Sequence, residues 1–481
     1  MKNDASANQS SPAAGRRTRR ILTGILMVLI ALAAVHGVAT LILGRKVEAR
    51  IQEYRAKGDP VSGYDLAGPT IPDFVNGGVI YDQVSLDVKQ IRDKEPKGEE
   101  DFALNTVSRD PKRRETPGIW EAAQKYASPM VRLLPELEAA AAKPECRYKT
   151  NWQDEPDRVM FPHFARLREV ARSLSVLAAL DARNGNMDGA VRALTAGYKV
   201  SESIEKEPVL IGMLVRVAIL DVTSQALKCC AGYGHFDQRH ARQLYDVLSN
   251  MEMQENWKLA MNGERECGIQ IYKSVPRRGA DIALAIYGIQ DSDGPSFRRF
   301  FLERIVPSYA WRPFLYADEL CYFSETDGLF SYLDLPYRQI ISDHIDEHLD
   351  LAKSNLPEYA VFAASIGPND IFRGVCGRRD QATASISGDQ IFLALLAYKD
   401  IHGSYPRTLD ELRSELGWKL KEEPFSGKDF IYKLEGKGFL LYSIGINLKD
   451  DGGRSRTDFP RRPGKRGLAE EADDIAWRMD R

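Results

Sequence analysis

Two histidines form the pair in this sequence whose type and spacing best suit metal chemistry. His344 and His348 stand four residues apart in DHIDEHLD, so a helix would place both on one face, and Asp343 or Glu347 could complete a metal site. The order differs from the HExxH motif, because the glutamate lies beside the second histidine. An exposed polar helix surface is the simpler interpretation. An exported metal-dependent hydrolase that uses this pair is therefore an alternative hypothesis.

Other catalytic patterns are missing from the sequence. It contains no GxSxG, no P-loop, no GxGxxG after a strand and no cluster of Cys and His ligands. The charged run at residues 264–266 predicts a solvated helical face. His163, which stands between Phe161 and Phe164, predicts a partly buried packing residue. We assign no catalytic residue, and these patterns favour a structural or interaction protein over an enzyme.

A membrane-spanning helix is predicted near the N-terminus. Residues 21–43 carry no charge, and at 1.5 Å per residue this helix would extend about 34 Å, enough to cross a hydrocarbon core. Residues 1–20 predict a disordered cytoplasmic tail that ends in four arginines. Five basic residues also follow the span, so the orientation depends on the short tail acting as a signal anchor. Cleavage of a signal peptide after residues 31–33 is the competing interpretation.

Composition and charge describe the rest of the chain as an exported globular body. The 481 residues include 66 Lys plus Arg against 68 Asp plus Glu, so no net field attracts nucleic acid. If the anchor holds, the body lies in the periplasm and the chain resides in the inner membrane of a bacterium. The six cysteines contain no CxxC pair and are predicted to be buried free thiols.

The exported body is predicted to be mainly α-helical. Residues 44–116 should hold a juxtamembrane helix, a helix over 78–93, a linker and a surface loop over 95–116. In residues 117–376 apolar side chains recur every three or four positions, which indicates an irregular α-helical domain. A polar turn around Gly185 predicts an antiparallel helix pair, partly similar to a tetratricopeptide repeat. The apolar helix over 210–228, which carries Arg216 and Asp221, should be its centre.

Residues 380–481 predict a small α+β module. An amphipathic helix over 391–402 precedes a capping box, Thr408 with Glu411, which starts a helix over 409–416. Two β-type runs, 429–434 and 439–444, are joined by a glycine-containing turn that fits a hairpin.

The motifs LAYKDIHGSYPRTLDEL, EPFSGKDFIYK, GFLLYSIGINLKDDGG and ADDIAW occur in this order over residues 389–477. In this order they resemble the globular domain of the G-type pseudopilin of type II secretion systems. The resemblance implies a helix packed on a small antiparallel sheet and a calcium ion in the loop after the second strand. The matching positions are Asp450 and Asp451, with Asp473 and Asp474 in the closing motif. A basic insertion over 454–467 would repel the ion unless that loop lies elsewhere.

Two departures separate the chain from pseudopilins. No acidic residue lies inside its apolar helix, and about 340 residues separate that helix from the module. The whole arrangement is similar to that of membrane-anchored envelope proteins of planctomycete-type bacteria. We therefore expect a single-pass, extracytoplasmic protein that binds protein partners, possesses no nucleic-acid function and is linked to secretion or envelope machinery.

Overall fold

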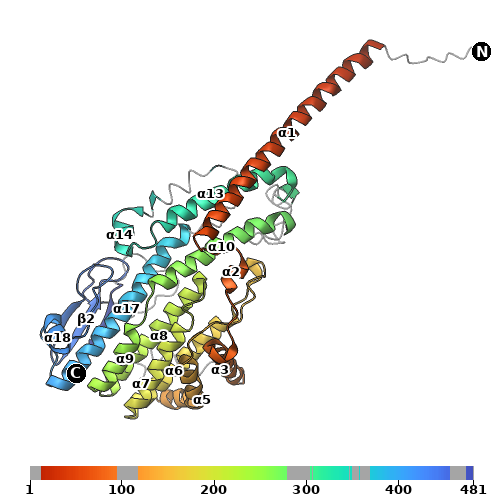
Figure 1. Cartoon of the computed structure of the whole chain (residues 1–481). Coiled ribbons are helices and arrows are strands. Elements are labelled where there is room, and N and C mark those ends of the chain that lie inside the picture. Colours follow the sequence, from red (N-terminus) through yellow and green to blue (C-terminus); the bar gives the residue numbers. More distant parts are fainter. Residues whose placement is uncertain are drawn as a thin grey trace, which may run out of the picture. The chain divides into compact units, whose positions relative to one another are not determined.

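The computed structural model describes residues 12–94, 117–278, 304–305, 307–345, 347–348, 357, 369–454 and 473–479. The chain divides into two compact units. Figure 1 shows the helices and strands that make them up. Unit 1 comprises Met1–Val61, Ile269–Glu325 and Asn355–Gly367, and unit 2 comprises Ser62–Gly268, Thr326–Ser354 and Pro368–Arg481. The predicted surface loop over 95–116 and all of the basic insertion except Arg454 lie outside the described residues.

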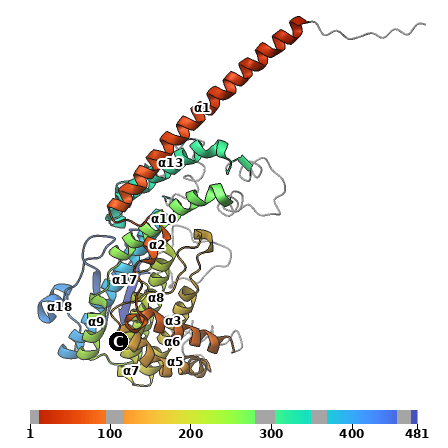
Figure 2. The ribbon, with the colours of Figure 1, turned by 45° about the vertical axis from the view of Figure 1, so that its right-hand side comes forward.

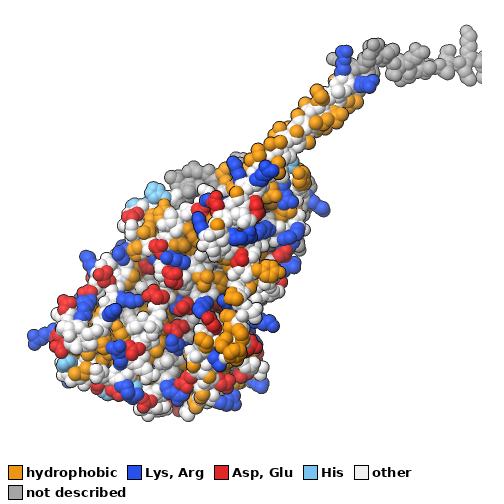
Figure 3. Space-filling model, viewed as in Figure 1, with side chains coloured by type: hydrophobic (Ala, Val, Ile, Leu, Met, Phe, Trp, Pro, Cys, Tyr) orange, Lys and Arg blue, Asp and Glu red, His pale blue; other side chains and the backbone are white. Residues whose placement is uncertain are grey.

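Unit 1 contains the predicted membrane helix as part of α1 (Pro12–Ala56). The helix begins at Pro12, so the expectation of a disordered tail up to residue 20 is wrong for residues 12–20. Proline is favoured in the first turn of a helix, and alanine and arginine favour the turns that follow. The predicted juxtamembrane helix is confirmed as the continuation of α1. Apart from Leu43, the large apolar side chains of the predicted span are exposed, among them Ile21 and Leu29, and Figure 3 shows this apolar stretch along α1.

The core of unit 1 joins the end of α1 to parts of α10 (Gln254–Arg278) and α13 (Arg312–Phe330). Its buried side chains include Ile51, Tyr54 and Phe323, and the rings of the last two meet edge to face at 5.5 Å. Tyr272 donates a hydrogen bond to Asp318 at 2.9 Å within this core. Aromatic packing and the buried hydrogen bond hold the three helices together.

Unit 2 is built on a layer of packed helices, and its mainly helical character confirms that part of the predicted fold class; the likeness of its C-terminal part to a pseudopilin stays a prediction. Those helices are α3 (Gly77–Arg92), α5 (Ile119–Ala141), α6 (Pro162–Arg183), α7 (Met187–Glu202), α8 (Leu210–Tyr233) and α9 (Gln238–Ser249). Shorter elements are α2 (Gly63–Ala67), η1 (Asp73–Val75), η2 (Pro156–Arg158) and α14 (Tyr337–Ser342). The predicted helix pair is confirmed: α6 and α7 pack together, and Gly185 turns between them with φ +79°. Its similarity to a tetratricopeptide repeat stays a prediction.

Helix α8 is the apolar centre of unit 2, as predicted. Arg216 is fully buried on it and donates to Glu205 at 3.1 Å and to the carbonyl of Glu252 at 2.8 Å, whereas Asp221 is exposed. The charged run on α10 differs from its prediction. Arg265 and Glu266 are 3% and 2% exposed, so the expectation of a solvated face is wrong.

The burial of that charged run follows from its place beside α8. Glu264 accepts a hydrogen bond from the amide of Leu210 at 3.0 Å, so its carboxylate satisfies one of the free amides at the start of α8. Burial raises the pKa of Glu264, while the Leu210 amide lowers it.

All six cysteines are free thiols, as predicted, but only Cys229, Cys230 and Cys376 are buried.

The C-terminal segment joins the same unit through α17 (Asn369–His402), which Figure 2 shows beside α8 and α9. This 34-residue helix runs without a break across the predicted domain boundary at 376–380, so the boundary does not separate two bodies. The next helix, α18 (Leu409–Leu416), begins and ends at the predicted residues. The Glu411 amide donates to Thr408 as expected, but its carboxylate reaches the amide of Arg407.

Three strands form an antiparallel sheet in the order β1-β2-β3. They are β1 (Ile431–Glu435), β2 (Gly438–Ser443) and β3 (Ile475–Met479), with Ile431 opposite Tyr442 and Phe439 opposite Met479. The predicted hairpin is confirmed, and Gly436 has φ +59° in its turn. The third strand brings Trp477, which is fully buried, onto α17.

We expect Gly388→Ala to destabilise the protein, although alanine is a better helix former than glycine and Gly388 lies inside α17. A Cβ at Gly388 would lie 2.1 Å from the buried Trp477 ring, so the ring and β3 must move. Gly374, on the same helix, has no atom within 4 Å of such a Cβ. Gly374→Ala should therefore stabilise by up to about 1 kcal/mol through helix propensity. Urea unfolding of both variants measures this, and equal shifts would contradict the packing argument.

Candidate functional site

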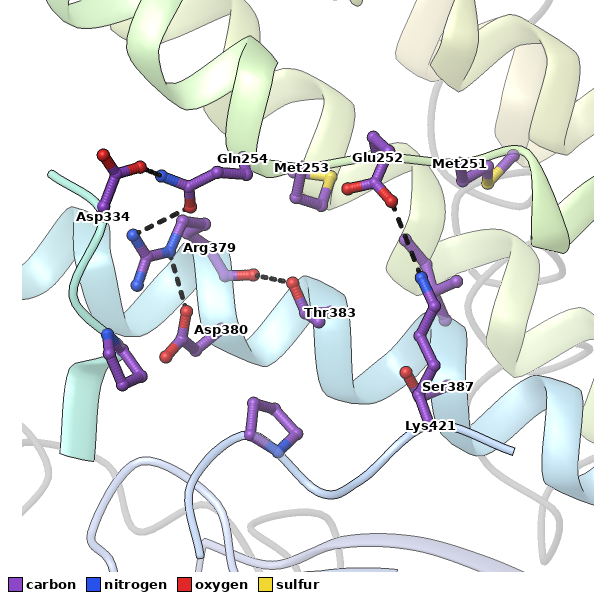
Figure 4. Close-up of a pocket in the computed structure, with 13 residues that line it drawn as sticks. Met251, Glu252, Met253, Gln254, Asp334, Arg379, Asp380, Thr383, Ser387 and Lys421 are labelled. Atoms are coloured by element: carbon purple, nitrogen blue, oxygen red, sulfur yellow. Dashed lines mark hydrogen bonds and ion pairs between the residues drawn. The ribbon is translucent and has the colours of Figure 1, made fainter. Parts of the chain in front are cut away.

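The candidate binding site is a half-open pocket of about 210 Å³ in unit 2. It lies among the loop between α9 and α10, the turn before α14, α17 and the chain before β1 (Figure 4). Apolar side chains share its lining with polar or charged ones: Met251, Met253, Pro336, Ile386 and Pro424 with Glu252, Gln254, Asp334, Arg379, Asp380, Thr383, Ser387 and Lys421. A mixed lining of this kind suits a small ligand with both polar and apolar parts.

Arg379 organises one end of the pocket. It is 3% exposed and donates to Asp380 at 2.7 Å, to Gln254 at 3.2 Å and to the carbonyls of Leu333 and Leu335 at 2.9 and 2.7 Å. These bonds hold the turn before α14 onto α17. The guanidinium is thereby engaged by the protein itself, so we assign it a positioning role.

The other end of the pocket carries an ion pair and a hydroxyl. Lys421 lies 3.7 Å from Glu252, and Ser387 Oγ is buried without a hydrogen-bond partner. A serine acts as a nucleophile only when a neighbouring base removes its proton, and the lining side chains include no histidine. The arrangement can hold a small polar group, with the Ser387 hydroxyl free to bond to it.

The four aspartates that the resemblance implies as calcium ligands come together where the loop after β2 meets the segment before β3. Asp474 accepts hydrogen bonds from the amides of Asp451 and Gly453 at 3.1 and 2.7 Å, and Asp451 accepts one from the amide of Asp473 at 3.1 Å. Burial raises the pKa of Asp474 to about 6. These carboxylates, with Asp450, pin the loop ends. Among described residues, no group of three or more Asp, Glu, His or Cys is placed to hold a metal.

Calcium binding by this loop stays a prediction with a direct test. If the ion binds, calcium should raise the melting temperature of the full chain, and Asp450→Ala should abolish the rise. Asp450 also accepts hydrogen bonds from Tyr442 at 3.0 Å and Gly452 at 2.9 Å, so the variant must be compared with wild type in chelator. Equal melting of wild type with calcium and with chelator would contradict the prediction.

The histidine pair does not share a helix face. His344 has φ +53°, a left-handed conformation outside α14, and its side chain is 67% exposed. It interacts with Glu347 at 3.1 Å, and His348 is exposed as well. His344 lies in a turn and not in a helix. The spacing of four residues therefore does not place the two histidines on one helix face, which the hydrolase hypothesis required.

A buried polar network that sequence reasoning missed lies around Asp389 on α17. Its carboxylate, 1% exposed, accepts hydrogen bonds from Tyr198 on α7 at 2.9 Å, Ser224 on α8 at 2.8 Å and the indole of Trp477 on β3 at 2.7 Å. Lys228 lies over the Trp477 ring at 4.7 Å. Burial raises the pKa of Asp389, while Lys228 and the three donors lower it.

One sequence signal could have indicated this network. Asp389 stands at the edge of the apolar run IFLALLA, in the helical register of Phe392 and Leu393, which are fully buried. A charged residue in such a register needs buried partners. The sequence does not say which residues these are, because they come from three other elements.

Comparison with known proteins found no match to the chain among family models, curated proteins or solved structures.

Proposed function

We propose that the chain is a single-pass, membrane-anchored protein of structural or interaction type, whose body lies in the periplasm of a bacterium. In this proposal α1 crosses the inner membrane, and unit 2 binds protein partners of the secretion or envelope machinery. The pseudopilin-like order of motifs over residues 389–477 is what favours secretion machinery over other partners.

One observation carries the anchor. The most apolar window of α1 has a mean hydropathy of 2.6 and none of it is buried within the protein. Leaving about twenty apolar residues in water would be costly, at roughly 25 cal/mol per Å² of exposed apolar surface. The other long apolar helix, α8, has 67% of its window buried, so its hydropathy is explained by the core of unit 2.

Charge insertion tests the anchor. Leu32 on α1 is 60% exposed, and Leu32→Arg would place a charge inside the span at a cost of about 3 kcal/mol. We expect this variant to be depleted from carbonate-washed membranes. Ile401→Arg is the matched control, because Ile401 is a 47% exposed apolar residue of unit 2 and should not affect membrane retention. Wild-type protein that carbonate extracts as readily as Leu32→Arg would contradict the anchor.

Orientation and partners need separate measurements. A C-terminal alkaline phosphatase fusion should be active and a C-terminal green fluorescent protein fusion dark if the body is periplasmic. A mature N-terminus that begins directly after Ala33 would instead identify a cleaved signal peptide. Affinity purification from solubilised membranes should return the same partners in repeated experiments, and their loss on replacing residues of unit 2 would locate the binding surface. Reproducible absence of partners would contradict the interaction proposal.

A further inference from the structure

One face of α1 is covered by protein within the apolar segment itself. Between residues 35 and 47 the partly buried and buried positions recur with helical spacing, while their neighbours are exposed. This covered stripe consists of His36, Gly37, Ala39, Thr40, Leu43, Gly44 and Val47. It is rich in small residues, which let another segment approach a membrane helix closely. Unit 1 therefore begins to pack on α1 before the apolar run has ended.

Among the described residues, the segment 307–316 contacts this stripe at His36 and Gly44; it comprises the turn η5 (Tyr309–Trp311) and the start of α13. His36 Nε2 lies 3.1 Å from the carbonyl oxygen of Tyr309 and 3.2 Å from that of Ala310. Both partners are acceptors, so Nε2 carries the proton and donates. Farther along α1, a Cβ at Gly44 would lie 3.1 Å from the Tyr316 ring, so only a small residue allows this approach.

These contacts place the turn at a known depth in the apolar run. His36 precedes Leu43 by seven residues, which corresponds to about 10 Å along a helix. If residues 21–43 cross the bilayer, the backbone that meets His36 lies below the level at which the run ends. Backbone carbonyls in such a place need an internal hydrogen-bond partner, and His36 supplies one to Tyr309 or Ala310.

The outward side chains of this segment match a membrane interface. Tyr309 and Phe314 are 66% and 43% exposed. Trp311 is partly buried against the core of unit 1, and its ring stacks on that of Phe314 at 4.5 Å. Arg312 lies 5.8 Å from the centre of the Tyr316 ring. Tyrosine and tryptophan concentrate where hydrocarbon meets headgroups, and an arginine there extends its charged end toward the phosphates.

We propose that residues 307–316 form an interfacial anchor, embedded in the outer leaflet beside α1, and that lipid is the occupant of the surface formed by Tyr309 and Phe314, with Trp311 directly behind Phe314. The inference rests on the proposed membrane span. Continuity with that span favours lipid over a second copy of the chain, because a protein occupant would have to enter the bilayer to reach a segment bonded to His36. The protein would thus hold the membrane by α1 and by this second segment.

Tryptophan fluorescence in vesicles tests the interfacial anchor. The chain has six tryptophans, and Trp311 is the one in unit 1; the five in unit 2 are at most 8% exposed. We would reconstitute the full chain in phosphatidylcholine vesicles whose acyl chains are brominated either near the headgroup or near the terminal methyl. Bromine near the headgroup should quench the emission component that comes from Trp311, and bromine near the methyl should quench it less.

Two variants assign the quenched component. Trp311→Phe should lose it, whereas Trp418→Phe, which removes a 7% exposed tryptophan of unit 2, should retain it. Flotation of the same vesicles separates the two proposals. Wild-type protein that floats with the vesicles but shows equal emission in brominated and plain lipid overturns the interfacial anchor and leaves the span intact. Protein that fails to float overturns the span, and with it the interfacial anchor.

Discussion

Replacing Asp389 with alanine is expected to lower the unfolding free energy of the full chain in detergent by about 3–5 kcal/mol. The variant leaves the hydroxyls of Tyr198 and Ser224 and the indole of Trp477 without their acceptor inside unit 2. Each buried donor that loses its partner costs about 1–3 kcal/mol. Lys228, whose pKa burial already lowers, also loses the carboxylate that most favours its charged form.

The Asp389→Asn variant keeps an acceptor oxygen at this position, so it should cost less than Asp389→Ala. Adding Lys228→Met to Asp389→Asn should cost less than Lys228→Met does in the wild type, since the lysine then has no carboxylate to balance. Asp410→Ala is the matched control: Asp410 is 88% exposed in its pair with Arg413, and its loss should cost less than about 1 kcal/mol. Similar losses at both aspartates in urea unfolding would show that the buried network contributes little.

Acidification is expected to destabilise the protein through His163 between about pH 6.5 and pH 4. The imidazole is 2% exposed, stacks on Tyr148 with ring centres 4.4 Å apart, and its Nε2 has no hydrogen-bond partner. Burial lowers the pKa of His163 to about 4, with a smaller opposing effect from Asp82 and a lowering one from Arg166.

The direction of this pH dependence follows from how many protons the folded and unfolded states bind. In the unfolded chain His163 has its ordinary pKa of about 6.5, so between pH 6.5 and 4 the unfolded state binds more protons than the folded state. Stability is therefore present above pH 6.5 and is lost as the pH falls toward 4. A shift of this size corresponds to about 3 kcal/mol over the window.

His163→Phe keeps the aromatic stack on Tyr148 and removes the titrating group. The difference in unfolding free energy between wild type and this variant should grow in favour of the variant as the pH falls from 7 to 4. The comparison with the variant is needed because other groups also titrate in this range. Burial raises the pKa of Glu207 to about 7, so Glu207 makes the folded state more stable as the pH falls, which is opposite to the effect of His163. His402→Gln, at an exposed histidine, is the control. A pH-independent difference for His163→Phe would refute the assignment.

Local patterns predicted most of the elements that short-range interactions determine. Gly185 turns between α6 and α7 because a left-handed residue is needed there, and the capping box at Thr408 starts α18. The hairpin of β1 and β2 follows from two β-type runs around Gly436. Each of these signals involves residues within a few positions of one another, so the sequence contains the whole cause.

The prediction failed where burial depends on distant segments. The run at residues 264–266 has the composition of a solvated face, yet Arg265 and Glu266 are buried. His344 and His348 have helical spacing, but the chain turns at His344 with φ +53°. The prediction of a helix over 391–402 is confirmed, but α17 begins at Asn369, much earlier than predicted. The added turns pack on α8 and α9, and the local apolar pattern did not indicate them.

The sequence by itself determined the apolar run of α1, the helical character of the body and the short motifs at the C-terminus, since periodicity and turn chemistry act between near neighbours. Only the tertiary structure decided that the C-terminal sheet belongs to the same unit as α8. Asp389 meets Tyr198, which is 191 residues away, and Trp477, which is 88 residues away. Such a buried carboxylate is stable only when all its partners arrive together, and no local pattern identifies partners at that separation.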